Sequence, residues 1–151
     1  MAVRYKLEAD LDIKAPAEKY YQFMKTTVYH FPNISDKIQQ IDVHQGAWDT
    51  HGSIHVWTYS IGDKKNQTFK ERVEHDDRNL AIIMTGLEGH VFNEFKSYKG
   101  TFKAIPKNNG TCTVKHIIEY EKLGEDSPDA HKYLDFIVGL SKDAEAHLVK
   151  N

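Results

Sequence analysis

The chain has 151 residues and a formal net charge of −2, which is enough length for one domain with a substantial core. The slight negative charge excludes the basic surface that nucleic-acid-binding proteins and proteins of anionic membranes carry. No stretch approaches about 18 uninterrupted apolar residues, so the sequence predicts no membrane insertion. We expect a single domain over residues 1–151.

The single cysteine and the N-terminal residues bear on the cellular compartment. Cys112 has no second cysteine to pair with, which favours a reducing compartment. The N-terminal segment is charged at Arg4 and lacks the apolar stretch of a signal peptide. We therefore expect a cytoplasmic protein.

The N-terminal third of the chain predicts one strand and two helical pieces. From Val3 to Ile13, apolar and charged residues alternate without a break, which is the pattern of a strand with one face in water. The segment 15–18 (Ala-Pro-Ala-Glu) then opens a helix. We expect Pro32 to close a second short helical piece.

The middle of the chain returns to a period of two and predicts six more strands, separated by short turns rich in Gly, Asn and Asp. The predicted strands are Gln39–Gln45, Gly52–Ile61, Gln67–Glu74, Leu80–Thr85, Glu94–Ile105 and Thr111–Glu121. Seven strands with short connections favour an antiparallel meander.

The alternation also predicts which side chains point inward. In the fourth strand Phe69, Glu71 and Val73 form the inward set, opposite charged residues. In the third strand either the His55, Trp57 and Tyr59 face or the opposite face could be inward. In the last strand the predicted inward residues are Cys112, Val114, His116, Ile118 and Tyr120.

The segment Pro128–Val149 predicts a long amphipathic helix. Ser127 precedes Pro128 and an acidic residue, as at a helix start. Gly139 lies in the interior, where glycine costs about 1 kcal/mol against alanine. Either a neighbour approaches the backbone closely there, or the helix bends. The fold class is α+β, with a curved seven-stranded antiparallel sheet gripping this helix and two short helices after the first strand.

Three separated blocks carry a family resemblance. Residues 46–59 (GAWDTHGSIHVWTY), 87–102 (LEGHVFNEFKSYKGTF) and 114–129 (VKHIIEYEKLGEDSPD) resemble the major latex protein branch of the Bet v 1 or pathogenesis-related class 10 family of plants. The resemblance covers essentially the whole chain. It implies a cavity between sheet and helix that holds small hydrophobic molecules, such as hormones, flavonoids, sterols and alkaloids. Some members of the family serve in plant defence, and a minority are enzymes of alkaloid metabolism, including cyclases and isomerases.

The segment Gly46–Gly52 departs from the glycine-rich loop of the birch-allergen branch. It keeps two glycines and contains Trp48 and Asp49, which disfavour a phosphate-binding loop. A ribonuclease or nucleotide-binding role is therefore not expected, and we expect no nucleic-acid partner.

The inward residues and the apolar side of the C-terminal helix are the expected ligand contacts. Side chains could instead fill the same space, which the sequence leaves open. The expected contacts are Tyr5, Phe23, His55, Trp57, Tyr59, Phe69, Ile82, Met84, Tyr98, Phe102, Val114, Ile118, Leu134, Ile137, Val138 and Ser141.

Two inward polar residues are candidate catalytic groups. His116 lies between apolar residues and can titrate near neutral pH, although a neighbour could satisfy it as a core histidine. Glu71 must pair with a cation of a neighbouring strand, take up a proton or meet solvent. Together they could move a proton in a ring closure or a double-bond shift.

The sequence therefore predicts a carrier or storage protein for a small hydrophobic or amphipathic molecule, with an isomerase or cyclase using His116 and Glu71 as the alternative. His44, His51 and His55 lack the spacing of a metal site, so we expect no metal and no cofactor. We expect a monomer or a weak homodimer.

Overall fold

The computed structural model describes residues 3–150. Seven strands form one antiparallel sheet in the order β1-β7-β6-β5-β4-β3-β2, so β1 closes against the last strand and all other neighbours are consecutive. This is the predicted meander. The strands are β1 (Arg4–Ile13), β2 (Ile38–Gln45), β3 (Ser53–Ile61), β4 (Lys64–Asp76), β5 (Ala81–Gly89), β6 (Phe95–Pro106) and β7 (Cys112–Lys122).

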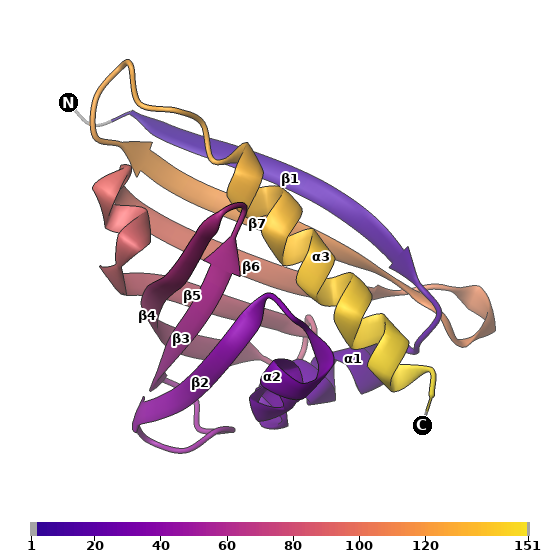
Figure 1. The fold of residues 1–151 in the computed structure, drawn as a ribbon. Coiled ribbons are helices and arrows are strands. Elements are labelled where there is room, and N and C mark those ends of the chain that lie inside the picture. The colour runs from indigo at the N-terminus through magenta and orange to yellow at the C-terminus, as the bar shows by residue number, and fades with distance from the viewer. Residues whose placement is uncertain (1–2, 151) are drawn as a thin grey trace.

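The helices lie on one side of the sheet. The long helix α3 (His131–Leu148) crosses the curved sheet, and α1 (Ala17–Thr26) and α2 (Phe31–Ile34) lie near its C-terminal end (Figure 1). Single turns of 3₁₀ helix connect other elements, namely η1 (Val28–His30), η2 (His90–Asn93) and η3 (Asn108–Gly110). This arrangement confirms the predicted fold class. Within residues 3–150, no helix combines the length and the apolar character that a membrane crossing requires.

The predicted strand faces agree with the burial of the side chains. All five predicted inward residues of β7 are buried, and their alternates are more exposed. The face of β3 that the sequence left open is settled, because His55, Trp57 and Tyr59 are at most 6% exposed and Trp57 and Tyr59 face α3 across the interior. Trp57 pairs with Phe69 of β4, which places the aromatic side chains of two strands on the same wall.

Two helix boundaries differ from the sequence prediction. Helix α3 begins after Ala130 instead of Ser127, because the Ser127 hydroxyl accepts a hydrogen bond from the Gly124 backbone N–H and closes a local turn. Pro32 lies in the first turn of α2 and does not end it. A proline is tolerated there, since the first-turn N–H groups have no partner inside the helix.

Gly139 in the middle of α3 makes room for a neighbouring side chain. A Cβ atom at this position would lie 3.2 Å from Cε of Lys37. Lys37 crosses the helix there and its Nζ reaches Asp143 Oδ2 at 3.2 Å, while the Ser35 hydroxyl donates to the same carboxylate oxygen. A close approach, which the sequence offered as one of two explanations, therefore accounts for this glycine.

Replacing Gly139 with alanine tests this contact. The added methyl gains about 1 kcal/mol of helix propensity, but it presses on the Lys37 side chain, which is flexible and partly exposed. We expect Gly139→Ala to stabilise the protein by about 0.5 kcal/mol in urea denaturation, and by about 1 kcal/mol in a Lys37→Ala background. Equal effects in the two backgrounds would show that Lys37 does not restrict this position.

Candidate functional site

A cavity lies between α3 and the strands β3 to β6. Its volume is about 70 Å³, and its wall is almost entirely apolar. Five aromatic residues of β3, β4 and β6, two methionines and one face of α3 surround it. The lining residues are Met24, Phe31, Ile38, Trp57, Tyr59, Phe69, Glu71, Met84, Val91, Tyr98, Gly100, Phe102, Tyr133, Phe136, Ile137 and Leu140.

The cavity is small for a ligand site. Pockets that enclose drug-sized molecules have volumes of about 300–1,000 Å³, against about 70 Å³ here. A guest with two or more rings therefore requires wall side chains to move. Met24 and Met84 are suited to this, because methionine has three rotatable bonds and repacks easily. Phe136 is only half-buried and has room on its outer side.

Seven of the expected ligand contacts line the cavity, and nine lie elsewhere. The seven are Trp57, Tyr59, Phe69, Met84, Tyr98, Phe102 and Ile137. Tyr5 stands at the outer end of the sheet, stacked on Tyr120 with ring centroids 5.5 Å apart. Val138 is half-buried on the flank of α3. The other residues outside the cavity wall are buried in the packed core, namely Phe23, His55, Ile82, Val114, Ile118, Leu134 and Ser141.

Sequence reasoning missed part of the wall. On α3, the side chains Tyr133, Phe136 and Leu140 face the cavity beside the expected Ile137. Their spacing of three and four residues marks one helical stripe, which the sequence could have shown once Tyr133 was counted as apolar. Met24, Ile38 and Val91 come from separate short elements, and only the three-dimensional arrangement brings them together.

Glu71 is the carboxyl group of the cavity wall. It is 1% exposed, and burial raises its pKa from the ordinary 4.5 to about 8. The indole N–H of Trp57 lies near this carboxyl without meeting hydrogen-bond geometry, and it limits the rise in pKa by favouring the ionised form. His55 Nδ1 stands 4.0 Å from Glu71 Oε2, and burial lowers the pKa of this histidine. At neutral pH the two groups are therefore an uncharged acid beside an uncharged imidazole.

Two further polar groups of the wall are buried without a partner. Within residues 3–150, neither Trp57 Nε1 nor the Tyr59 hydroxyl makes a hydrogen bond, and the same holds for Glu71 Oε2. Buried polar atoms without partners are uncommon in folded proteins. These three atoms belong to cavity-lining residues, and a guest that reaches them can supply the missing hydrogen-bond partners.

His116 is a hydrogen-bonded core residue and does not line the cavity. Its Nδ1 lies 3.2 Å from the carbonyl oxygen of Ala9, and its Nε2 lies 2.7 Å from the Ser141 hydroxyl. The Tyr20 hydroxyl lies 2.7 Å from the same serine oxygen. Nδ1–H thus donates to Ala9, Ser141 donates to Nε2, and Tyr20 donates to Ser141. Burial lowers the pKa of His116. The structure does not bring His116 and Glu71 together on one wall.

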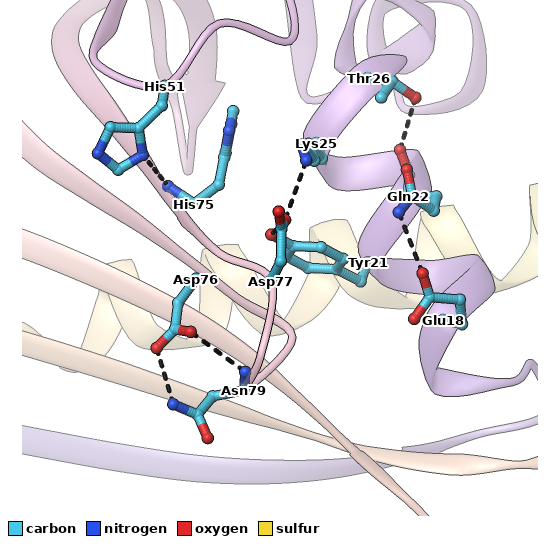
Figure 2. Close-up of polar contacts among 10 residues, drawn as sticks. All are labelled: Glu18, Tyr21, Gln22, Lys25, Thr26, His51, His75, Asp76, Asp77 and Asn79. Atoms are coloured by element: carbon cyan, nitrogen blue, oxygen red, sulfur yellow. Dashed lines mark hydrogen bonds and ion pairs between the residues drawn. The ribbon is translucent and has the colours of Figure 1, made fainter.

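A separate group of polar contacts lies where α1 meets the β4–β5 turn. Asp77, in the β4–β5 turn, accepts hydrogen bonds from Tyr21 and Lys25 of α1, and the His75 backbone N–H donates to His51 (Figure 2). These contacts fix α1 against the end of the sheet. In the part of the chain that the structure describes, no three His, Cys, Asp or Glu side chains gather as metal ligands do.

Removing the Ser141 hydroxyl leaves two buried groups without a partner, His116 Nε2 and the Tyr20 hydroxyl. We expect Ser141→Ala to lower the free energy of unfolding by about 1–3 kcal/mol in urea denaturation. Tyr20→Phe combined with Ser141→Ala should cost less than the sum of the single variants, since the groups form one chain. A Ser141→Ala protein as stable as the wild type would contradict this role.

Replacing Glu71 with glutamine removes a group whose folded-state pKa is raised. Between about pH 4.5 and pH 8 the unfolded chain has lost the Glu71 proton and the folded protein has kept it, so this group costs stability as the pH rises. We expect Glu71→Gln to match the wild type near pH 4.5 and to be more stable at pH 7, by about 3 kcal/mol at most. Urea denaturation across this range measures the difference, and parallel stability profiles would contradict the raised pKa.

Comparison with known proteins identifies the family. Residues 2–151 match the model of the pathogenesis-related protein Bet v 1 family. The chain is 36% identical to MLP-like protein 328 of Arabidopsis thaliana over 99% of both chains. The crystal structure of ginseng major latex-like protein 151 from Panax ginseng superposes with a TM-score of 0.89 at 33% identity, covering 96% of this chain and 97% of that one.

A more distant solved relative shares the fold. Norcoclaurine synthase from Thalictrum flavum, in complex with dopamine and hydroxybenzaldehyde, superposes with a TM-score of 0.73 at 18% identity, covering 98% of this chain and 87% of that one. At this identity the likeness concerns the fold alone. The family match over nearly the whole chain and the full-length similarity to major latex-like proteins agree with the seven-stranded sheet around α3, and the chain belongs to the Bet v 1 family, in its major latex protein branch.

Proposed function

We propose that this protein binds a small hydrophobic molecule in the cavity beneath α3 and stores or carries it. The observation that carries the proposal is an aromatic and methionine-rich space of about 70 Å³ between the sheet and the helix of an otherwise packed domain. Hormones, flavonoids, sterols and alkaloids are the candidate classes of guest. The protein acts in the cytosol as a monomer or weak homodimer, and the buried lone Cys112 suits a reducing compartment.

The free-energy cost of the empty cavity is small enough for the protein to fold before a guest binds. At about 24 cal/mol per Å³, a void of about 70 Å³ costs the fold about 2 kcal/mol. This is a modest part of a typical stability of about 5–15 kcal/mol, so the protein folds without a guest. A guest that binds only the folded state adds stability in proportion to its concentration over its dissociation constant.

A guest enters most readily beside the first turns of α3. There Phe136 is half-buried and its ring packs on Tyr59 with centroids 5.3 Å apart. The first turn of α3 is held in place, because the Tyr133 hydroxyl and Lys132 both contact the Glu94 carboxylate. Rotation of Phe136 opens the wall at this point without breaking a backbone hydrogen bond.

Catalysis in the same cavity is the second candidate function, and Glu71 favours it. A carboxyl group with a pKa of about 8 can donate and accept a proton near neutral pH. His116 supports it less, since both ring nitrogens have partners and the residue lies outside the cavity wall. An enzyme should convert one scaffold selectively and lose turnover in Glu71→Gln. A carrier should release every bound compound unchanged.

Fluorescence of the cavity tryptophan tests binding directly. The chain has two tryptophans, and Trp48→Phe leaves Trp57 of the cavity wall as the only one. We expect members of a hormone, flavonoid, sterol and alkaloid panel to change Trp57 emission and to raise the melting temperature of this variant.

Gly100→Val is the matched control. Gly100 lines the cavity, and a Cβ atom there would meet no atom within 4 Å, so a valine side chain has room to extend into the cavity. We expect the variant to melt at a higher temperature than the wild type and to lose the ligand response. If no member of the panel changes the Trp57 emission or the melting temperature of the Trp48→Phe variant, the proposed function is contradicted.

A further inference from the structure

The unpartnered polar atoms of the cavity lie on one part of its wall. Trp57 Nε1, the Tyr59 hydroxyl and Glu71 Oε2 are buried without hydrogen bonds among residues 3–150. The exposed fractions of their residues are 6%, 4% and 1%. All three residues line the cavity. The other hydroxyl groups among the lining residues belong to Tyr98 and to Tyr133, which is bonded to Glu94, and the remainder of the wall is carbon-rich.

The strand register places Trp57 between the other two side chains, because Tyr59 lies opposite Gln67, two inward positions from Glu71. Trp57 and Tyr59 are two residues apart on β3 and share its inner face. Glu71 on β4 pairs with His55, the preceding inward residue of β3, so it is the diagonal neighbour of Trp57. We call Trp57, Tyr59 and Glu71 the donor patch, because each can offer a hydrogen to a guest. The indole donates only, and the phenol and the protonated carboxyl both can donate.

The donor patch carries no charge at neutral pH. Burial raises the pKa of Glu71 to about 8 and the pKa of Tyr59 to about 12. The titratable groups that face Glu71 from neighbouring strands are also neutral. On β3, burial lowers the pKa of His55, and on β6, burial raises the pKa of Tyr98. His75, further along the inner face of β4, likewise has a pKa lowered by burial.

No lysine or arginine belongs to the cavity wall among residues 3–150. A ligand carboxylate would therefore lose its hydration without gaining a cation. A ligand ammonium would meet the positive end of the Trp57 N–H, and it could pair with Glu71 only after that buried acid had lost its proton. A carbonyl oxygen has two lone pairs and no charge to desolvate, so it can accept from two of the three groups at once.

We infer that the donor patch selects ligands by an uncharged carbonyl oxygen, a ketone or lactone on an otherwise apolar skeleton, over carboxylates and amines of the same size. This inference rests on the proposed function, because it assigns a chemical class to the guest of the same cavity. The apolar wall provides affinity in proportion to the apolar area that the ligand buries, and the donor patch discriminates among ligands by their polar group.

Four benzene derivatives of similar size separate the possibilities. Acetophenone, ethylbenzene, benzoate and benzylammonium differ chiefly in the polar group, and single rings are the smallest probes of the cavity. Binding is followed at pH 7 by NMR of ¹³C-labelled methionine methyl groups, since Met24 and Met84 line the wall. We expect acetophenone to bind about 10-fold more tightly than ethylbenzene, as one or two net hydrogen bonds provide. Benzoate and benzylammonium should bind no more tightly than ethylbenzene.

Variants and pH assign the preference to the donor patch. Tyr59→Phe should weaken acetophenone binding by about 3- to 10-fold and leave ethylbenzene unchanged. Trp57→Phe also enlarges the cavity, so its expected effect is a fall of about 3- to 10-fold in the ratio of acetophenone affinity to ethylbenzene affinity. Tyr133→Phe is the matched control, because Tyr133 lines the same cavity but its hydroxyl is bonded to Glu94.

In the wild type, acetophenone affinity should fall as the pH rises above about 8, where Glu71 ionises. Glu71→Gln keeps an N–H donor and should remove this pH dependence.

The outcomes distinguish the two levels of the proposal. If ethylbenzene binds as tightly as acetophenone, or if benzoate or benzylammonium binds more tightly, the cavity accepts guests but the selection by a carbonyl is overturned. The same conclusion follows if the wild-type preference does not change between pH 7 and pH 9. If none of the four probes, ethylbenzene included, shifts the methyl resonances of Met24 or Met84 up to its solubility limit, the cavity takes no guest and the proposed function fails as well.

Discussion

The position of α3 relative to the sheet is the constraint on which the site depends. Polar contacts hold the helix at both ends. Near its start, Glu94 binds Tyr133 and Lys132, and near its end Asp143 binds Ser35 and Lys37. Between these points the helix crosses the curved sheet (Figure 1), and Ser141 bonds to His116 of β7. A helix fixed at two ends cannot settle further into the sheet, so incomplete filling of the space beneath it leaves a cavity.

The buried chain from Ala9 through His116 and Ser141 to Tyr20 adds a third fixed point. It joins β1, β7, α3 and α1 in one network with every polar group satisfied. Satisfied networks specify one arrangement of the elements that they connect, because any displacement leaves several groups unpaired. The contrast with the donor patch is informative. The molecule contains one buried polar network that is complete, away from the cavity, and one set of polar atoms that is incomplete, on the cavity wall.

The sequence was sufficient for the architecture because the fold depends on local patterns. Period-two alternation located all seven strands and the inner faces of β4 and β7, and the apolar stripe located α3. The start of α3 was misplaced at Ser127, since a serine before a proline suits both a helix cap and the turn that it closes with Gly124. Pattern alone cannot tell which backbone N–H the hydroxyl will meet.

The site was predictable only in part, for a different physical reason. Alternation identifies inward residues, but the cavity is a property of volume left over after packing. Ile82 and Val114 point inward and are fully packed, while Phe69 and Met84 point inward and border empty space. The two candidate polar residues differ in the same way. His116 finds Ser141 from another element 25 residues away in the chain, and Glu71 finds no partner for Oε2 within residues 3–150.

The small size of the cavity and the donor patch together account for selectivity better than either feature alone. A guest larger than about 70 Å³ must shift the population toward a state in which Phe136 and the methionines have moved. If that state lies about 2 kcal/mol above the closed one, every guest loses about 30-fold in apparent affinity. An apolar guest recovers this loss only through buried area, which many molecules offer. A guest that also accepts hydrogen bonds from Trp57, Tyr59 or Glu71 removes the existing cost of leaving them unpaired, so the donor patch decides among guests of equal size.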